Sequence, residues 1–335
     1  MDFKEELAMK VEISKLIELS LTALLQSGMS NEDAEIVTNH LLDEELLGKH
    51  SHGFIRLPSI INCTKSFEGK GNFKYEWSSE SIVRLIAENE VGLVAAYKAT
   101  ECAISIADKY GFAMVSSIGY SGTTGALGYY ARLIASKGLI GIISCTSEYA
   151  VAPWGGKDAI LGTNPIAVAL PNKDNPIISD FSTAAMTYGD LMLAAKESRE
   201  VPYGIVLDKE GKQSHNPNDA NDGCQLPMAE HKGYALGLAV EVLAGLFIGA
   251  KSGKESVIGS DGFLILSFKP NIFIPENQYF NNIASLVKEI KNSALASESS
   301  GIRTPGEGSV KKIITMRESG ICEMPDVIFR EISKL

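Results

Sequence analysis

The spacing of apolar residues predicts a helix-rich segment over residues 10–65. One set of apolar positions recurs every three or four residues, as expected for the buried face of an α-helix. These positions are Ile36, Val37, Leu41, Leu42 and Leu46. Ser30 stands before them with Asp33 three residues later, a capping-box pattern that starts a helix, and Gly48 is expected to end it.

From about residue 80, short apolar runs alternate with helical patterns. The runs typical of strands are 81–87, 112–117, 139–145 and 261–268. The helical segments are 92–109, 126–136, a long segment 227–250 that is expected to be buried, and an amphipathic segment 278–296. This alternation predicts an α/β layer architecture.

The glycine-rich turn after the run at 112–117 differs from the usual dinucleotide fingerprint. Gly119, Gly122, Gly125 and Gly128 fall at every third position, whereas G-x-G-x-x-G places its first two glycines in one tight turn. The turn is therefore interpreted as a helix amino terminus that binds phosphate, as a substrate-facing turn or as a purely structural turn. The glycine spacing disfavours a Rossmann enzyme, and no Walker A sequence occurs either.

Net charge and cysteine usage restrict the classes of partner. The chain of 335 residues has a formal net charge of -10, so its surface should repel nucleic acid and anionic lipid. Its five cysteines are widely spaced and form no CxxC pair, which argues against a disulfide framework or a zinc site. No bound metal is expected, and a reducing cytosol fits best.

The hydropathy pattern argues against export and against membrane insertion. The amino-terminal sequence MDFKEELAMKVEISK lacks the apolar core of a signal peptide. The longest apolar run, 235–250, is broken by Glu241 and by glycines and is shorter than the roughly 18 residues of a membrane span. A soluble, cytoplasmic protein is therefore expected.

The segment from His50 to Arg56 is a candidate catalytic motif. Reduction of a keto acid needs a proton for the new hydroxyl, which an imidazole supplies near neutral pH. It also needs a cation for the substrate carboxylate, and a guanidinium offers two parallel donors. His52 and Arg56 lie four residues apart, so a helix would place them on one face. The alternatives are that His50 is the active base, or that both histidines lie in a solvated surface turn.

Two carboxylates flank a Ser/Thr-rich loop that follows an apolar run at residue 178. Either Asp180 or Asp190 could orient an imidazole, because an ionised partner fixes the tautomer and favours the charged ring. The structural alternative is that Asp180 caps the helix that follows.

Two further turns carry groups suited to a phosphate. His231 and Lys232 stand at the predicted start of the long helix 227–250, where backbone N–H groups and positive charge coincide. The segment 303–308, which reads RTPGEG, offers backbone donors and one arginine. Each turn could equally be an ordinary capped loop.

Taken together and in order, these motifs resemble the malate/L-lactate dehydrogenase type 2 family. That family includes ureidoglycolate, sulfolactate and diketogulonate oxidoreductases and piperideine-2-carboxylate reductases. The matching stretches span residues 51–308 and are SHGFIRLP, GALGYYA, GLIGI, VAPWGGKDAILGTNPIAVALP, SDFST, HKGYALGLAVEVLAG and RTPGEG. The long VAPWGG…LGTNPIA signature is the most specific of them.

The resemblance implies a non-Rossmann nicotinamide-binding fold. It implies a helical domain of residues 1–78 completed by 292–335, a central α/β cofactor-binding domain of residues 79–291, and a homodimer with the active site near the subunit boundary. The expected cofactor is NAD or NADP, and the expected partner is a small carboxylate substrate.

The resemblance also assigns roles to matching residues. His52 is expected to donate the proton and Arg56 to hold the substrate carboxylate, with Ser51 and Asp190 forming a relay with the histidine as in the imine-reducing branch. The residues expected at the cofactor are Asp180, Phe181, Ser182, His231, Lys232, Pro305, Gly306 and Glu307.

One departure from the family pattern concerns a second histidine in an N-S-x-H-x-G loop. Here Thr123 occupies that position, and a threonine can hydrogen-bond a substrate but cannot exchange a proton near pH 7. His52 is therefore expected to act alone or with Asp190.

Three functions are consistent with the sequence. The first is NAD(P)-dependent hydride transfer to or from a small 2-oxo or 2-hydroxy acid of the malate or lactate type. The second is reduction of a cyclic ketimine such as piperideine-2-carboxylate at the same site. The third is a nucleotide-binding protein without catalysis, which only the Thr123 departure favours.

Overall fold

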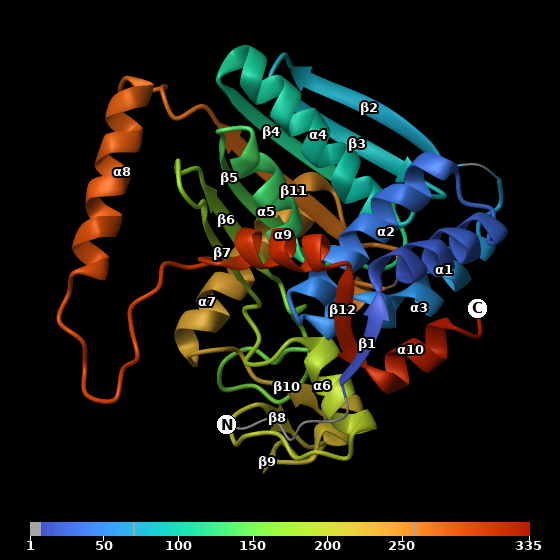
Figure 1. The fold of residues 1–335 in the computed structure, drawn as a ribbon. Helices are drawn as coiled ribbons and strands as arrows, with labels where there is room; N and C mark the ends of the chain where they lie inside the picture. The colour runs from blue at the N-terminus through green and yellow to red at the C-terminus, as the bar shows by residue number, and fades with distance from the viewer. Residues whose placement is uncertain (1–7, 70, 258) are drawn as a thin grey trace.

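A seven-stranded mixed sheet forms the centre of the computed structural model, which describes residues 8–69, 71–257 and 259–335 (Figure 1). The strand order is β2-β3-β4-β11-β5-β6-β7. The strands are β2 (Asn72–Ser79), β3 (Ile82–Glu88), β4 (Phe112–Ile118), β5 (Ile140–Cys145), β6 (Ile166–Leu170), β7 (Ile177–Phe181) and β11 (Gly262–Phe268). The α/β architecture is confirmed, and its mixed strand directions differ from the mostly parallel Rossmann sheet. Residues 1–7, part of the segment inspected for a signal peptide, lie outside the described residues.

Strand direction determines which loops meet. β11 is antiparallel to both of its neighbours, β4 and β5, and β6 is antiparallel to β5 and β7. β4, β5 and β7 therefore run the same way, and their carboxyl ends lie along one edge of the sheet. The four strands predicted from apolar runs are confirmed to within one residue at each end.

Helices α4 (Gly92–Tyr110) and α5 (Leu127–Ser136) pack against one face of the sheet and confirm the helices predicted at 92–109 and 126–136. Fully buried small side chains at Ala95, Ala99 and Ala103 allow α4 to approach the strands closely. Alternate strand residues such as Val115 and Ile143 point into this layer and form the largest core cluster with the helices.

The segment 227–250 is not the single buried helix that the sequence predicts. It consists of α7 (His231–Val240), a π-helical turn (Glu241–Gly245) and a 3-10 turn (Leu246–Ile248). One side packs on the second face of the sheet through Val240, Ala244 and Ile248. The other side leaves Leu243, Leu246 and Phe247 exposed. The prediction was wrong because the segment is apolar on both sides, so its composition does not show which side faces the sheet.

The stretch His231–Ile248 is long and apolar enough to cross a membrane, by its length and composition alone. The stretch includes Glu241, whose carboxylate accepts hydrogen bonds from Asn164 Nδ2 and Ser252 Oγ, each at 2.6 Å. One such helix is weak evidence for a span, and the cytoplasmic location stays a prediction.

The two ends of the described chain lie side by side (Figure 1). β1 (Ala8–Glu12) pairs antiparallel with β12 (Ile321–Pro325). Around this pair lie α1 (Ile13–Gln26), α2 (Asn31–Leu46), α3 (Leu57–Lys65), α9 (Ser309–Ser319) and α10 (Asp326–Ile332). One hydrophobic cluster includes side chains from both ends, among them Leu42 and Ile328. The domain boundaries near residues 78 and 292 stay a prediction.

The predicted start of α2 is confirmed, because Ser30 Oγ accepts a hydrogen bond from the backbone N of Asp33 at 3.1 Å. α2 ends at Leu46, and the chain then enters two short 3-10 turns, η1 (His50–His52) and η2 (Phe54–Arg56). The helix-rich segment predicted over residues 10–65 is therefore broken where the candidate catalytic motif lies.

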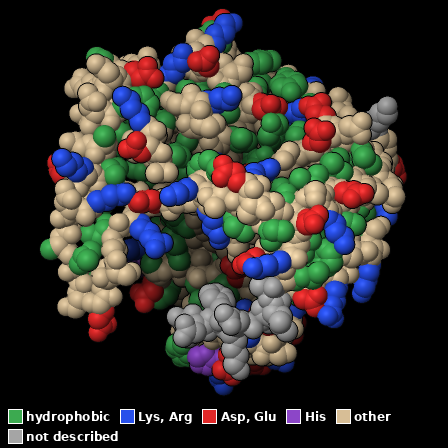
Figure 2. Space-filling view, viewed as in Figure 1, with side chains coloured by type: hydrophobic (Ala, Val, Ile, Leu, Met, Phe, Trp, Pro, Cys, Tyr) green, Lys and Arg blue, Asp and Glu red, His purple; other side chains and the backbone are tan. Residues whose placement is uncertain are grey.

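A smaller unit follows β7. It contains α6 (Tyr188–Lys196), the 3-10 turn η3 (Pro217–Asn221), and a small sheet of β8 (Val206–Leu207), β9 (Gln213–Ser214) and β10 (Cys224–Gln225). A further 3-10 turn, η6 (Gly253–Glu255), precedes β11. α8 (Glu276–Lys291) stands apart at one side of Figure 1 and has no buried residue. Basic and acidic side chains are interspersed over the face shown in Figure 2.

Candidate active site

The candidate site lies where the carboxyl end of β7 meets the loop that follows α2. This loop does not continue as the single helix that would place His52 and Arg56 on one face. Instead, Gly53, with ψ -148°, separates η1 from η2. The two side chains nevertheless remain within electrostatic range, because the charge of Arg56 lowers the pKa of His52.

Hydrogen bonds order this loop from within. Ser51 Oγ lies 3.0 Å from His52 Nδ1, and Arg56 Nε donates to the backbone O of Ser51 at 2.7 Å. Ser51 therefore contacts both functional side chains, one through its hydroxyl and the other through its carbonyl. The part of the proposed relay that joins Ser51 to His52 is present in the geometry.

The buried carboxylate of Glu45, at the end of α2, contacts both short turns of the loop. Glu45 Oε1 lies 2.5 Å from His50 Nδ1, and its Oε2 accepts from the backbone N of Phe54 at 2.9 Å. A Cβ at Gly53 would lie 2.1 Å from Glu45 Oε2, so a glycine is required for this close approach. His50 is thus engaged by Glu45, and His52 stays the predicted proton donor.

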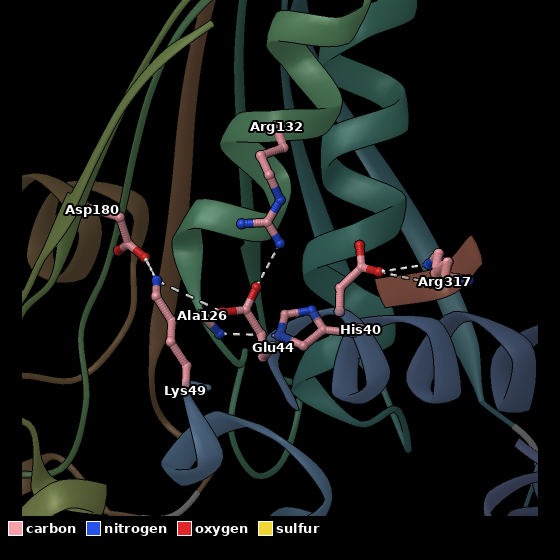
Figure 3. Close-up of polar contacts among 8 residues, drawn as sticks. His40, Glu44, Lys49, Ala126, Arg132, Asp180 and Arg317 are labelled. Carbon is pink, nitrogen blue, oxygen red and sulfur yellow. Dashed lines mark hydrogen bonds and ion pairs between the residues drawn. The ribbon is translucent and has the colours of Figure 1, made fainter. Parts of the chain in front are cut away.

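Glu45 is the last of three consecutive carboxylates that tie α2 to different parts of the molecule. Asp43 pairs with Arg317 of α9 at 2.7 Å, and Glu44 pairs with Arg132 of α5 at 2.6 Å (Figure 3). Carboxylates at a helix carboxyl terminus are disfavoured by the helix dipole, so these cationic partners compensate them. The three side chains hold the end of α2 at the seam between the chain-end helices and the sheet.

Asp180 takes part in the same network. It lies at the end of β7, and its Oδ2 accepts from Lys49 Nζ at 3.0 Å, while Lys49 also lies 3.7 Å from Glu44 Oε2 (Figure 3). A Cβ at Gly128 would lie 2.7 Å from Asp180 Oδ2, so this carboxylate sits at the first turn of α5. The alternative that Asp180 caps the next helix is wrong, because Thr187 caps α6.

The start of α6 packs against the loop that carries His52 and Arg56. A Cβ at Gly189 would lie 2.8 Å from both Arg56 Nη2 and Ser51 Cβ, so Gly189 packs directly against the loop. Asp190 follows; burial lowers the pKa values of His52 and Arg56, and the charge of Asp190 opposes this lowering. Among the hydrogen bonds of the described residues, the Asp190 carboxylate has none to His52, so it acts on the imidazole through charge at longer range.

Burial and the charge of Arg56 lower the pKa of His52 to about 4; Asp180 opposes this shift, Lys49 adds to it, and Asp190 opposes it. The ring is therefore neutral at pH 7 before substrate binds. A neutral imidazole in this position is suited to accept a proton. A bound anion that offsets the nearby cations would raise the pKa of the ring.

The residues expected at the cofactor are distributed over three segments, two of which meet beyond β7. Phe181 is exposed at the end of this strand, and Ser182 Oγ donates to Thr163 O at 2.9 Å. The backbone N of Met228 donates to Thr183 O at 2.9 Å, which brings the start of α7 beside this strand end. His231 and Lys232 are exposed there, on a helix amino terminus whose Ncap residue makes no side-chain capping bond.

The third segment, Pro305-Gly306-Glu307, packs along the same strand. The backbone N of Ile178 donates to Pro305 O at 3.0 Å, and Gly306 has φ +73°. Glu307 accepts from the N and Oγ1 of Thr304 and pairs with Lys291 Nζ at 2.6 Å, which lowers its pKa to about 2. Glu307 therefore stabilises its own turn, and its contact with the cofactor stays a prediction.

The glycine-rich turn at 119–125 follows β4 and leads to α5, as the sequence predicts. Thr123 Oγ1 accepts from the backbone N of Gly125 at 3.0 Å, so the threonine organises the turn itself. A Cβ at Gly92 would lie 2.6 Å from Thr123 O, which places the turn against the start of α4. The role of Thr123 in substrate binding stays a prediction.

His40 is part of the site's surroundings but was not singled out from the sequence. It is buried on α2, and its Nε2 accepts from the backbone N of Ala126 at 3.1 Å (Figure 3). Burial, aided by the charge of Arg132, lowers its pKa well below the usual value. The neutral ring joins α2 to the start of α5, a structural role that its position among apolar residues does not reveal.

Known proteins are similar to this chain over nearly its whole length. The family model described as Malate/L-lactate dehydrogenase matches residues 11–333. The chain is 34% identical over 303 residues to the malate/(S)-sulfolactate dehydrogenase of Methanothermus fervidus, which covers 88% of each protein. The sulfolactate dehydrogenase structure from Methanocaldococcus jannaschii has 30% identity and a TM-score of 0.87, covering 97% of this chain and 96% of that one. The malate dehydrogenase structure from Pyrococcus horikoshii has 28% identity and a TM-score of 0.88, covering 100% and 97%.

Proposed function

The chain belongs to the malate/L-lactate dehydrogenase family and is a 2-hydroxyacid oxidoreductase, and we propose that His52 exchanges the proton and Arg56 binds the substrate carboxylate. The resemblance seen in the sequence is confirmed. Dehydrogenases of this family use NAD or NADP, and one relative at 30% identity is named as an NADP-dependent sulfolactate dehydrogenase. The choice between the two cofactors is left to experiment.

The observation that carries this proposal is the arrangement of His52 and Arg56 in one hydrogen-bonded loop. Nδ1 of His52 is engaged by Ser51, so Nε2 is the ring nitrogen for the substrate oxygen. Arg56 uses Nε to hold the loop carbonyl, so its terminal nitrogens serve the substrate carboxylate. A general acid–base group and an anion-binding group are thus fixed by the same backbone.

The electrostatics couple substrate binding to proton transfer. In the oxidation direction, neutral His52 takes the hydroxyl proton from a 2-hydroxy acid as the carbonyl forms. In the reduction direction, a substrate carboxylate on Arg56 offsets the cation that lowers the pKa of His52. The pKa of the imidazole then rises from its value in the free protein, which favours the protonated ring that donates to the new hydroxyl oxygen.

The strand end and the start of α7 fit a dinucleotide. When bound, the nicotinamide supplies or takes up the hydride. The amino terminus of α7 offers backbone N–H groups together with His231 and Lys232, a combination suited to phosphate. Ala229 and Glu230, with φ of 45° and 59°, form a strained turn just before the helix, as is common at binding sites.

A cyclic ketimine carboxylate is a second candidate substrate. Asp180 and Asp190 both face His52 electrostatically, and two carboxylates near the reacting centre would stabilise a positively charged iminium. The absence of a second histidine at position 123 suits a substrate that arrives already protonated. The non-catalytic nucleotide-binding alternative is set aside, because the chain is a family dehydrogenase with His52 and Arg56 in place.

A substrate panel tests the proposed function. The purified full chain is expected to oxidise NADH or NADPH with at least one of sulfopyruvate, oxaloacetate and pyruvate. The reaction is followed as a decrease in the absorbance of the reduced cofactor. Faster turnover with piperideine-2-carboxylate than with every 2-oxo acid would favour the ketimine alternative. No oxidation of either cofactor with any of these acids would contradict the proposal.

We also propose that the protein is a homodimer, with a helical domain completed by both chain ends in each subunit. α8 has no buried residue although Ile283, Leu286 and Val287 give it an apolar face, and Leu246 and Phe247 are exposed beyond α7. Large exposed apolar patches mark protein–protein interfaces, and these exposed residues motivate the proposal. Sedimentation equilibrium is expected to give twice the chain mass of 36.0 kDa, and a mass of one chain would contradict the dimer.

A further inference from the structure

Lys49 joins the catalytic loop to the far side of the site. We propose that Lys49 is a positioning residue, whose ion pair with Asp180 ties the loop that carries His52 to the end of β7 and so fixes the imidazole relative to the reacting carbon. Lys49 Nζ and Asp180 Oδ2 are 3.0 Å apart, and the residues are 131 positions apart in sequence. The inference rests on the proposed function and adds a residue to it.

The pair is anchored from both ends. Glu44, whose side chain is 0% exposed, lies 3.7 Å from Lys49 Nζ and 2.6 Å from Arg132 Nη2. The Asp180 side chain is 16% exposed and lies against the first turn of α5, where the helix dipole favours a carboxylate. The chain Arg132–Glu44–Lys49–Asp180 therefore runs along the seam between α2 and the sheet (Figure 3).

These anchors argue against a direct substrate contact by Lys49. Its ammonium already faces the two carboxylates of Asp180 and Glu44, so its charge is compensated before any anionic substrate binds. Arg56, by contrast, forms no ion pair among the described residues; it donates through Nε to the carbonyl of Ser51, and the charge of Asp190 acts on it at longer range. The geometry assigns substrate binding to Arg56 and positioning to Lys49.

The pair also places opposite charges around His52. The charged or titratable groups that face the imidazole are Arg56 of η2, Lys49 of the loop, Asp180 of β7, Asp190 of α6 and His40 of α2. Lys49 lowers the pKa of His52 and Asp180 raises it. Removal of the Lys49 charge should therefore raise the pKa of His52, and removal of the Asp180 charge should lower it. A merely structural role of the ion pair does not require these opposite shifts.

The test uses the full-length protein with Lys49→Met, Asp180→Asn, the double variant and Lys49→Arg. The control is Lys98→Met, because Lys98 of α4 also pairs with a carboxylate of α2, Glu32, but at the opposite end of this helix, roughly 20 Å away at 1.5 Å per residue. Turnover is measured with the best substrate of the panel. The pKa of His52 is measured by NMR titration of its ring Cε1–H in the ligand-free protein, with the signal assigned by its loss in His52→Ala.

We expect Lys49→Met to lower kcat about 10- to 100-fold, the scale of a small misplacement of a catalytic group. We also expect it to raise the pKa of His52, Asp180→Asn to lower that pKa, and the double variant to lose less activity than the product of the single losses. Lys49→Arg should restore most of the turnover, and Lys98→Met should resemble the unmodified protein.

If Lys49→Met matches Lys98→Met in turnover and titration, or if the single losses multiply, Lys49 has no positioning role. An unmodified protein that is inactive on the whole panel contradicts the proposed function instead, and the NMR titration still tests Lys49.

Discussion

Replacement of His52 by alanine should lower turnover by roughly 10²–10⁴-fold, the contribution typical of general acid–base catalysis. We propose His52 as the histidine that faces the substrate, because its Nδ1 is held by Ser51 and the neighbouring His50 is engaged by Glu45. The dissociation constant of the reduced cofactor, measured by nicotinamide fluorescence, should change by less than about threefold, because no part of the proposed phosphate seat is altered.

The matched control is His50→Ala, which removes an imidazole from the same loop. Its loss of turnover should be at least tenfold smaller than that of His52→Ala, although the free energy of unfolding is expected to fall because the buried carboxylate of Glu45 loses its half-buried partner. A large loss in His50→Ala together with unchanged turnover in His52→Ala would assign the proton transfer to the other histidine.

Replacement of Arg56 by methionine should lower kcat/KM for a 2-oxo acid by about 10²–10³-fold, mainly through KM. The expected factor corresponds to about 3–4 kcal/mol, which lies within the range for loss of one partner of a buried charged pair. Arg56→Lys should lose less, because it keeps the charge but not the two-pronged geometry. Steady-state kinetics over a wide substrate range separates the effects on kcat and KM.

The Arg56→Met variant should also change the pH dependence of alcohol oxidation. In the unmodified protein, His52 must be neutral to accept a proton, so kcat/KM should fall only as pH approaches its pKa of about 4. Because Arg56 is among the groups that lower this pKa, its removal raises the pKa and moves the acid limb to higher pH. A limb that stays in place, or moves to lower pH, would show that Arg56 does not act on His52.

The central sheet was predictable because its strands are short apolar runs separated by polar or glycine-containing turns. The run 139–145, for example, is buried between α5 and the neighbouring strands and appears as β5. The candidate catalytic motif was also recognisable, because a histidine can supply a proton and an arginine four residues away can bind a substrate carboxylate. The local geometry was not predictable in the same way. Gly53, with a non-helical ψ of -148°, separates two short turns where a single helix was expected, and Glu45 lies close against it.

The ion pairs that hold the candidate site in place could not be predicted from the sequence alone. Lys49 meets Asp180 131 positions away, and Glu44 meets Arg132 88 positions away, so no local spacing joins the partners. One signal was available. The three consecutive carboxylates at residues 43–45 stand at a helix carboxyl terminus, where the dipole disfavours them, directly before the histidine-containing loop. Such a cluster indicates that cations from elsewhere in the fold must meet it.

The decisive experiment is a crystal structure of the protein with reduced cofactor and a non-reacting 2-oxo acid analogue such as oxamate. We expect His52 Nε2 within about 2.6–3.2 Å of the analogue's carbonyl oxygen, the Arg56 guanidinium on its carboxylate, and the nicotinamide ring beside both. A dinucleotide bound away from the carboxyl end of β7, or an analogue out of reach of both side chains, would contradict it.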